Sequence, residues 1–215
     1  MRSEPADAGL VEDWASLVRL ATAGAGWPEP PPPGTWATGP ADLAGGDDEL
    51  PGLLNRVPTG RLVILGEPGA GKTMLAVRLV LDLLAARPDG APVPLLVPLA
   101  SWDPNEHDLH TWLERRLTLD YPGLTTPVPG GTGTSRARAF LNRGLILAVL
   151  DGLDEIADGM RARAIVRIND ALRPGQRLVV TARTGDYHGA VTPFDGPGVR
   201  LAGATGISLR PLCPG

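Results

Sequence analysis

Five short runs of consecutive apolar residues constrain the fold of this 215-residue chain more than any other feature. The runs read RLVIL, VPLLVPL, LILAVL, RLVVTA and GISL, and all of them lie beyond residue 60. A strand that is apolar at every position must be covered on both faces, which is typical of a parallel sheet between two layers of helices. The sequence therefore predicts an α/β fold: a three-layer α/β/α domain with a mainly parallel, five-stranded sheet.

Helical segments separate these runs, as the crossover connections of a parallel sheet require. Helices are expected at residues 72–86, 108–119, 135–143 and 160–172. The second run contains Pro94 and Pro98, which have no N–H to donate, so this strand is placed at an edge of the sheet. Residues 122–134 carry no periodic pattern and are expected to form a mobile surface loop.

The first 49 residues differ in composition from the rest of the chain. Apolar residues at helical spacing predict a short amphipathic helix over residues 9–23. The proline-rich stretch that follows, GWPEPPPPGTWATGP, is expected to be an extended, stiff connector, with docking of a proline-recognition domain as the alternative. We therefore expect an N-terminal helix and linker over residues 1–49 and a core domain over residues 50–215.

Charge and composition argue against several classes of protein. A net charge of −4 and a pI near 5.4 predict no general attraction to nucleic acid or to anionic lipid. No signal peptide is recognisable, and no segment approaches the roughly 20 apolar residues of a membrane span. The one cysteine, Cys213, fits a reducing compartment. A cytoplasmic chain with no nucleic-acid or membrane partner is expected.

The octet GEPGAGKT lies between the first apolar run and the first expected helix of the core, and it matches G-x-x-x-x-G-K-[ST]. Its glycines let successive N–H groups point into one concavity, where the start of the helix adds its positive end, so the octet predicts a phosphate site. Lys72 is the only lysine, and the other 19 basic residues are arginines. A compact ammonium can reach β- and γ-phosphate oxygens inside a tight loop, where a guanidinium fork does not fit. The Thr73 hydroxyl is expected to bind Mg²⁺. The candidate nucleotide-binding residues are Gly66, Glu67, Pro68, Gly69, Ala70, Gly71, Lys72 and Thr73. A glycine-rich turn that binds no ligand is the alternative.

Acidic residues follow the third apolar run in the block LDGLDEI. Asp151 comes directly after this run, and ligands of open α/β sheets lie at the carboxyl ends of the strands, so Asp151 is the candidate metal carboxylate. Asp154 and Glu155 are candidates to orient or deprotonate an attacking water. An acidic helix start, stabilised by the helix dipole, is the alternative.

Arg183 follows the fourth apolar run and is expected at the same edge of the sheet. It is a candidate to sense or neutralise a γ-phosphate, as arginines do in phosphoryl transfer. A solvent-facing arginine is the alternative.

The octet, the LDGLDEI block and the VVTAR stretch, in this order and separation, resemble the NACHT branch of the STAND class of P-loop NTPases. The run VPLLVPLASWDP with LHTWLERRL is similar to NACHT proteins of actinobacteria. The resemblance covers residues 50–212 and implies the sheet order 5-1-4-3-2. It also implies that the octet is the phosphate loop, that Asp151 serves Mg²⁺, that Asp154 and Glu155 are the water-activating acids, and that Arg183 is the sensor.

Members of this family continue into a small helical domain and a winged helix, whereas the sequence here stops after ISLRPLCPG. The resemblance therefore implies a truncated NTPase core. Its sensor and effector domains, or partner proteins, are missing, and the full-length protein is expected to self-oligomerise when nucleotide binds.

The function predicted from these features is an Mg²⁺-dependent signalling switch, in bacterial signalling or defence, that binds ATP and hydrolyses it slowly. GTP stays an alternative, although an Asn-Lys-x-Asp guanine motif is ruled out because the only lysine lies in the octet. Two other functions stay open: a P-loop small-molecule kinase or other metabolic NTPase, and a module that holds nucleotide without turnover.

Overall fold

The structure is a computed structural model that describes residues 2–46, 52–129, 133–192 and 198–210. The expected boundary between residues 49 and 50 and the cysteine, Cys213, lie outside the described residues. The strands are β1 (Ser3–Pro5), β2 (Arg61–Gly66), β3 (Val93–Pro98), β4 (Ile146–Asp151), β5 (Leu178–Ala182) and β6 (Thr205–Leu209). The α-helices are α1 (Trp14–Ala23), α2 (Leu53–Arg56), α3 (Lys72–Ala85), α4 (Leu109–Asp120), α5 (Arg136–Asn142), α6 (Arg161–Ala171) and α7 (Thr184–Val191).

The strands form one mixed sheet with the order β1-β6-β2-β5-β4-β3. Strands β6, β2, β5, β4 and β3 run parallel to one another, and β1 pairs antiparallel with β6. The proline-bearing strand β3 lies at an edge, as predicted. The prediction of five strands was wrong, and the full order differs from the predicted one because β1 adds an edge beyond β6. Strand β1 has the sequence SEP, which contains no apolar pattern that could have predicted it.

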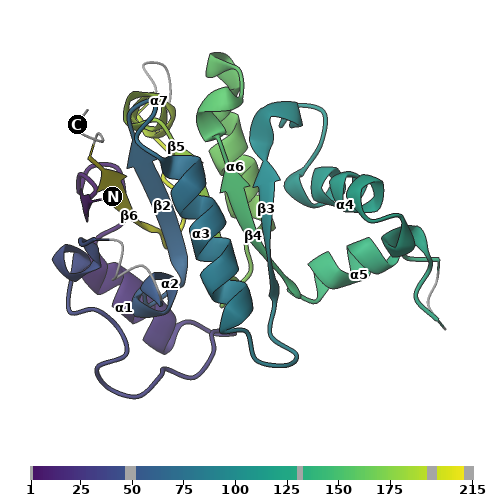
Figure 1. Cartoon of the computed structure of the whole chain (residues 1–215), viewed down its shortest axis with the longest axis horizontal. Helices are drawn as coiled ribbons and strands as arrows, with labels where there is room; N and C mark the ends of the chain where they lie inside the picture. The colour runs from purple at the N-terminus through teal and green to yellow at the C-terminus, as the bar shows by residue number, and fades with distance from the viewer. Residues whose placement is uncertain (1, 47–51, 130–132, 193–197, 211–215) are drawn as a thin grey trace.

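Helices cover both faces of the sheet (Figure 1). Successive residues of a strand point to opposite faces, so each strand packs against both layers of helices. Leu62 and Ile64 of β2 join a hydrophobic cluster with α2 and α3. Val63 and Leu65 join a second cluster with α4, α5, α6 and α7. All four side chains are fully buried, which explains the unbroken apolar run of this strand.

Three local expectations differ from the structure. Helix α1 begins at Trp14 rather than at residue 9, because the Asp13 side chain accepts a hydrogen bond from the Ser16 N–H and caps the helix there. Helix α7 was not predicted, since its sequence TGDYHGAV contains two glycines. Within the expected loop after α4, residues Pro122–Thr125 form a 3₁₀ helix.

No helix among the described residues is long and apolar enough to cross a lipid bilayer.

Arg61, at the start of β2, ties together three segments beneath the amino ends of the strands. The residue is only 4% exposed, and its guanidinium donates to the carbonyl oxygens of Gln176, Ala202 and Arg173 at 3.0, 2.8 and 2.7 Å. It also lies 5.0 Å from the ring centroid of Trp27, within the range of a cation–π contact. Burial lowers the pKa of Arg61 to about 10, so the side chain remains charged at neutral pH.

We expect Arg61→Met to lower the free energy of unfolding by about 3 kcal/mol, because it removes a buried guanidinium that donates to three part-buried carbonyl groups. Urea denaturation followed by circular dichroism measures the change. Arg116→Met is the matched control, since Arg116 forms an exposed ion pair with Asp120 whose loss costs about 1 kcal/mol or less. Equal losses for the two variants would contradict this role of Arg61.

Candidate nucleotide-binding site

The glycine-rich loop, residues 66–73, connects the carboxyl end of β2 to the first turn of α3. Gly69 and Gly71 have φ values of +77° and +91°, in the left-handed region that side-chain-bearing residues rarely adopt. Gly66 faces a second constraint, since a Cβ there would lie 3.1 Å from Ala70 Cβ. The glycines of the octet are therefore required by the path of the backbone.

The loop provides backbone hydrogen-bond donors and one cation. The first N–H groups of α3 have no acceptor within the helix, because helix geometry leaves them unpaired. Lys72 Nζ folds back into the loop and donates to Gly66 O at 2.9 Å and Glu67 O at 3.2 Å. Both sets of donors suit an anion with several oxygens, such as a polyphosphate.

Thr73 and Asp151 face each other across the sheet edge. Thr73 Oγ1 donates to Asp151 Oδ2 at 2.9 Å, which joins the start of α3 to the end of β4. A hydroxyl and a carboxylate are hard oxygen ligands of the kind that Mg²⁺ prefers, and a magnesium ion usually completes its shell with phosphate oxygens and water. The two residues predicted as metal ligands thus lie within contact of each other, and their chemistry fits this ion.

Thr181, which the sequence analysis did not single out, holds Asp151 in place. Its hydroxyl donates to Asp151 Oδ1 at 2.5 Å and accepts from the Gly152 N–H at 2.8 Å, and its side chain is fully buried. The only signal in the sequence is a polar residue near the end of the apolar run RLVVTA.

Thr181→Val preserves the shape of the side chain but removes both hydrogen bonds. We expect the free energy of unfolding to fall by about 1–3 kcal/mol, because the Gly152 N–H loses its buried partner. We also expect Mg²⁺ to strengthen nucleotide binding less than in the wild type, since Asp151 is no longer oriented. Urea denaturation and ATP titrations with and without Mg²⁺ measure the two effects. Thr181→Ser retains the hydroxyl and should keep both properties near wild type.

Asp154 and Arg183 form an ion pair at the same edge of the sheet. Arg183 Nε lies 2.8 Å from Asp154 Oδ2, and the Arg183 backbone N–H donates to Asp154 Oδ1 at 3.1 Å. The Asp154 side chain is 8% exposed, whereas that of Arg183 is 51% exposed. Glu155 is exposed and forms no ion pair with any described residue. The structure therefore separates the two candidate acids: Asp154 is paired, and Glu155 faces solvent.

Arg161, the first residue of α6, is a second contributor that the sequence analysis missed. Its guanidinium donates to the backbone oxygens of Asp154 and Ile156, both at 3.0 Å. It also pairs with Asp186 of α7 at 2.6 Å and with Asp158 at 2.8 Å, and its side chain is 13% exposed. Arg161 thus joins the acidic turn to the helix that begins immediately after Arg183. In the sequence it looks like one of several solvated arginines of a helix.

The glycine-rich loop connects a parallel strand to a helix, and it lies beside an acidic residue at the end of β4, two strands away in the sheet. This combination defines the class of P-loop nucleotide-binding domains. Residues 60–194 match the NACHT domain family model, which is more than half of the chain. The chain therefore belongs to the NACHT family, whose domains are P-loop NTPase modules that bind nucleotide. A search of curated proteins found no match to the chain.

Proposed function

We propose that this protein is an ATP-binding signalling switch of the STAND type that needs Mg²⁺ and hydrolyses ATP slowly. The observation that carries the proposal is the 2.9 Å contact between Thr73 Oγ1 and Asp151 Oδ2 beside the glycine-rich loop. It brings two hard oxygen ligands next to an array of phosphate-directed donors, which is the arrangement that a metal–nucleotide complex requires.

The proposed roles follow from the positions of the residues. The N–H groups of the loop and Lys72 hold the β- and γ-phosphates, and Thr73 and Asp151 hold Mg²⁺. When bound, the ion offsets negative charge on the phosphate oxygens. Glu155, exposed and without an ion-pair partner among the described residues, is the better placed of the two acids to activate water.

Arg183 supports a switching role because its partner can change. In the structure it pairs with Asp154, yet half of its side chain is exposed and thus accessible to a γ-phosphate. A phosphate carries more charge than a carboxylate and competes for the same guanidinium. The ion pair between Asp154 and Arg183 would then loosen with ATP and re-form after hydrolysis.

One observation favours the alternative of a module that holds nucleotide without turnover. Both carboxylate oxygens of Asp154 are engaged by Arg183, Oδ2 by its Nε and Oδ1 by its backbone N–H, so this acid is not free to act on water. Under that alternative, Arg183 stays with Asp154 whichever nucleotide is bound.

Incubation of the chain with ATP and Mg²⁺, followed by analysis of all phosphorus-containing products, tests the proposal. We expect slow release of inorganic phosphate, and we expect Glu155→Gln to reduce the rate while leaving ATP binding intact. A phosphorylated small-molecule acceptor would instead indicate a metabolic kinase. Tight nucleotide binding with no phosphate release above background would indicate the holding module. Parallel assays with GTP decide the choice of base.

The proposal extends to the setting of the protein. A cytoplasmic switch in bacterial signalling or defence would pass the state of its nucleotide to sensor and effector parts, or to partner proteins, and would self-oligomerise when it binds nucleotide. Size-exclusion chromatography of the full-length protein with ATP, with ADP and without nucleotide tests the last of these points.

A further inference from the structure

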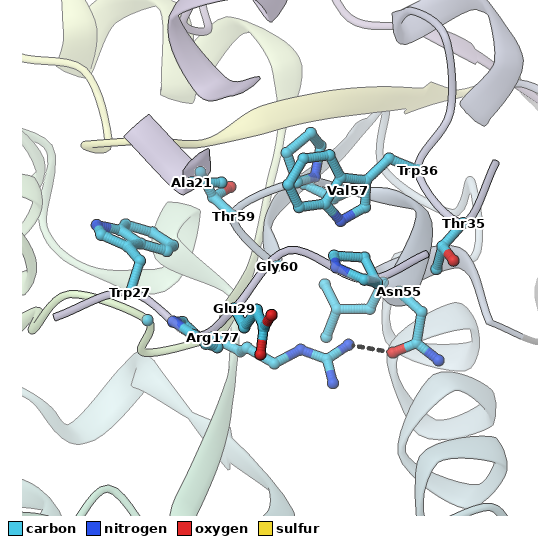
Figure 2. Close-up of a pocket in the computed structure, with 15 residues that line it drawn as sticks. Ala21, Trp27, Glu29, Thr35, Trp36, Asn55, Val57, Thr59, Gly60 and Arg177 are labelled. Carbon is cyan, nitrogen blue, oxygen red and sulfur yellow. Dashed lines mark hydrogen bonds between the residues drawn. The ribbon is translucent and has the colours of Figure 1, made fainter. Parts of the chain in front are cut away.

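Two adjoining pockets lie at the amino end of the parallel strands, opposite the glycine-rich loop. The first, here called the tryptophan pocket, has a volume of about 300 Å³, and Trp27 and Trp36 are among the residues that line it (Figure 2). The second, here called the arginine pocket, has a volume of about 610 Å³. Both pockets are lined by Trp27, Pro28, Gly175 and Arg177. Their volumes are in the range of sites that bind small molecules.

The walls shared by the two pockets are held in place by Arg61. This buried guanidinium binds the carbonyl oxygens of Arg173 and Gln176 and lies 5.0 Å from the Trp27 ring centroid. The shared segments also touch, since a Cβ on Gly175 would lie 2.8 Å from Pro28 Cδ. The pockets therefore belong to the packed structure and do not depend on a single loose side chain.

The two pockets differ in charge. The arginine pocket is lined by Arg143, Arg173 and Arg177, and none of its lining residues is acidic. The tryptophan pocket is mainly apolar, and its lining residues include one carboxylate, that of Glu29, and one cation, that of the shared Arg177. A ligand with one flat apolar part and one anionic part would thus bind in a single orientation.

Arg177 is the lining residue that a bound anion would stabilise most. Its side chain is half-buried, and its guanidinium donates to Asn55 Oδ1 at 2.7 Å, a neutral acceptor (Figure 2). It forms no ion pair with any carboxylate of the described residues. Burial lowers the pKa of this guanidinium, which reflects the loss of water around the charge. A negatively charged group where the two pockets meet, beside Arg177, would compensate for that loss.

We propose that the two pockets form one binding site for a molecule that combines a flat, largely apolar ring with a phosphate or carboxylate group. The ring packs against Trp27 and Trp36, and the anionic group lies between Arg143 and Arg177. Nucleotides and aromatic carboxylates share this chemistry. The site is separate from the glycine-rich loop, so it does not depend on the proposed function.

The probe for the test is 1-naphthyl phosphate, titrated into ¹⁵N-labelled chain carrying Lys72→Ala so that the glycine-rich loop does not compete for the phosphate. We expect the indole N–H resonances of Trp27 and Trp36 to shift, assigned by Trp→Phe variants. Those of Trp102 and Trp112, which stack on each other in the core, should not move. Absence of shifts at Trp27 and Trp36 overturns the proposal.

Two variants test the anionic half of the site. Arg143→Gln and Arg177→Gln should each weaken binding of 1-naphthyl phosphate by about 10-fold, since each removes a charge-assisted contact. Arg143 is exposed, so its variant stays informative if Arg177→Gln fails to fold. Arg116→Gln is the matched control and should bind as the parent does. Unchanged affinity in both site variants, or equal affinity for neutral 1-naphthol, overturns the proposal.

Two further ligands distinguish a nucleotide from an aromatic carboxylate as the molecule that binds. ADP that shifts Trp27 in the Lys72→Ala background supports the proposal with a nucleotide as the ligand. 1-Naphthoate that shifts Trp27 when ADP does not supports it with an aromatic carboxylate.

Discussion

Lys72→Ala is expected to lower the affinity of the chain for ATP at least about 10-fold. The ammonium lies inside the glycine-rich loop, where it donates to two backbone oxygens. Contacts between such a cation and phosphate oxygens contribute about 1.5–3 kcal/mol each, and 1.4 kcal/mol corresponds to a factor of 10 in Kd. Isothermal titration calorimetry with ATP and Mg²⁺ measures the change.

Two comparisons make this result specific. Arg116→Ala removes a cation from an exposed ion pair on α4 and should leave the affinity unchanged. Lys72→Arg keeps the charge but introduces a planar fork that does not fit the loop, so it should also bind poorly. If Lys72→Ala binds ATP as tightly as the wild type, the glycine-rich loop is not the nucleotide site.

Arg161→Ala is expected to slow ATP hydrolysis by about 10- to 100-fold while changing the Kd for ATP little, because displacing a catalytic group by about 1 Å can cost a factor of 100. Arg161 touches no part of the glycine-rich loop, so binding should survive. It holds the acidic turn at two carbonyl oxygens and links that turn to α7 through Asp186. Single-turnover kinetics and an equilibrium titration, made on the same preparation, separate the rate from the affinity.

A purely structural role would give a different pattern. Loss of stability alone would lower the active fraction, so the measured rate would fall but the rate per bound nucleotide would not. Arg163→Ala, an exposed position on the same helix, is the control and should match the wild type. Arg161→Lys should rescue the rate only in part, because an ammonium cannot reproduce the forked contacts of a guanidinium. An unchanged rate per bound nucleotide in Arg161→Ala would rule out a positioning role.

The sequence predicted those parts of the fold that depend on burial. Every apolar run forms a strand. Both faces of the sheet are covered by helices, so residues such as Ile64 and Val149 are buried whichever face they point to, and they must be apolar. Strand β1 escaped prediction because it is held by backbone hydrogen bonds to β6, which place no demand on side chains. Helix α7 escaped because tertiary packing, with Tyr187 and Val191 buried, outweighs its low helix propensity.

At the candidate site, spacing placed the glycine-rich loop and Asp151 at one edge of the sheet, and the structure brings Thr73 and Asp151 into contact. The partners of the other acids could not be predicted. The three acids of one short block suggested one shared site. In the structure Asp154 pairs with Arg183. Asp151 instead accepts hydrogen bonds from Thr73 and Thr181. Such choices depend on side-chain directions across different strands, and no local pattern in the sequence encodes them.

Both edge strands of the sheet, β3 and β1, have few free backbone N–H donors on their open side. On β3, the Val93 N–H donates to Leu145 O, toward the neighbouring strand β4. Backbone N–H groups alternate in direction along a strand, so positions 94, 96 and 98 face the open edge of the sheet. Two of these three positions are prolines. On β1, the outward Ser3 N–H is already bonded to Gly45 O, and the next outward residue is Pro5.

A seventh strand arriving from another molecule would therefore find one backbone donor on β3 and none on β1. Exposed edges with free donors are the usual starting points of fibrous aggregation. Pairing of these edges between copies of the chain should accordingly be disfavoured, and copies that do come together would be expected to meet through helices or loops.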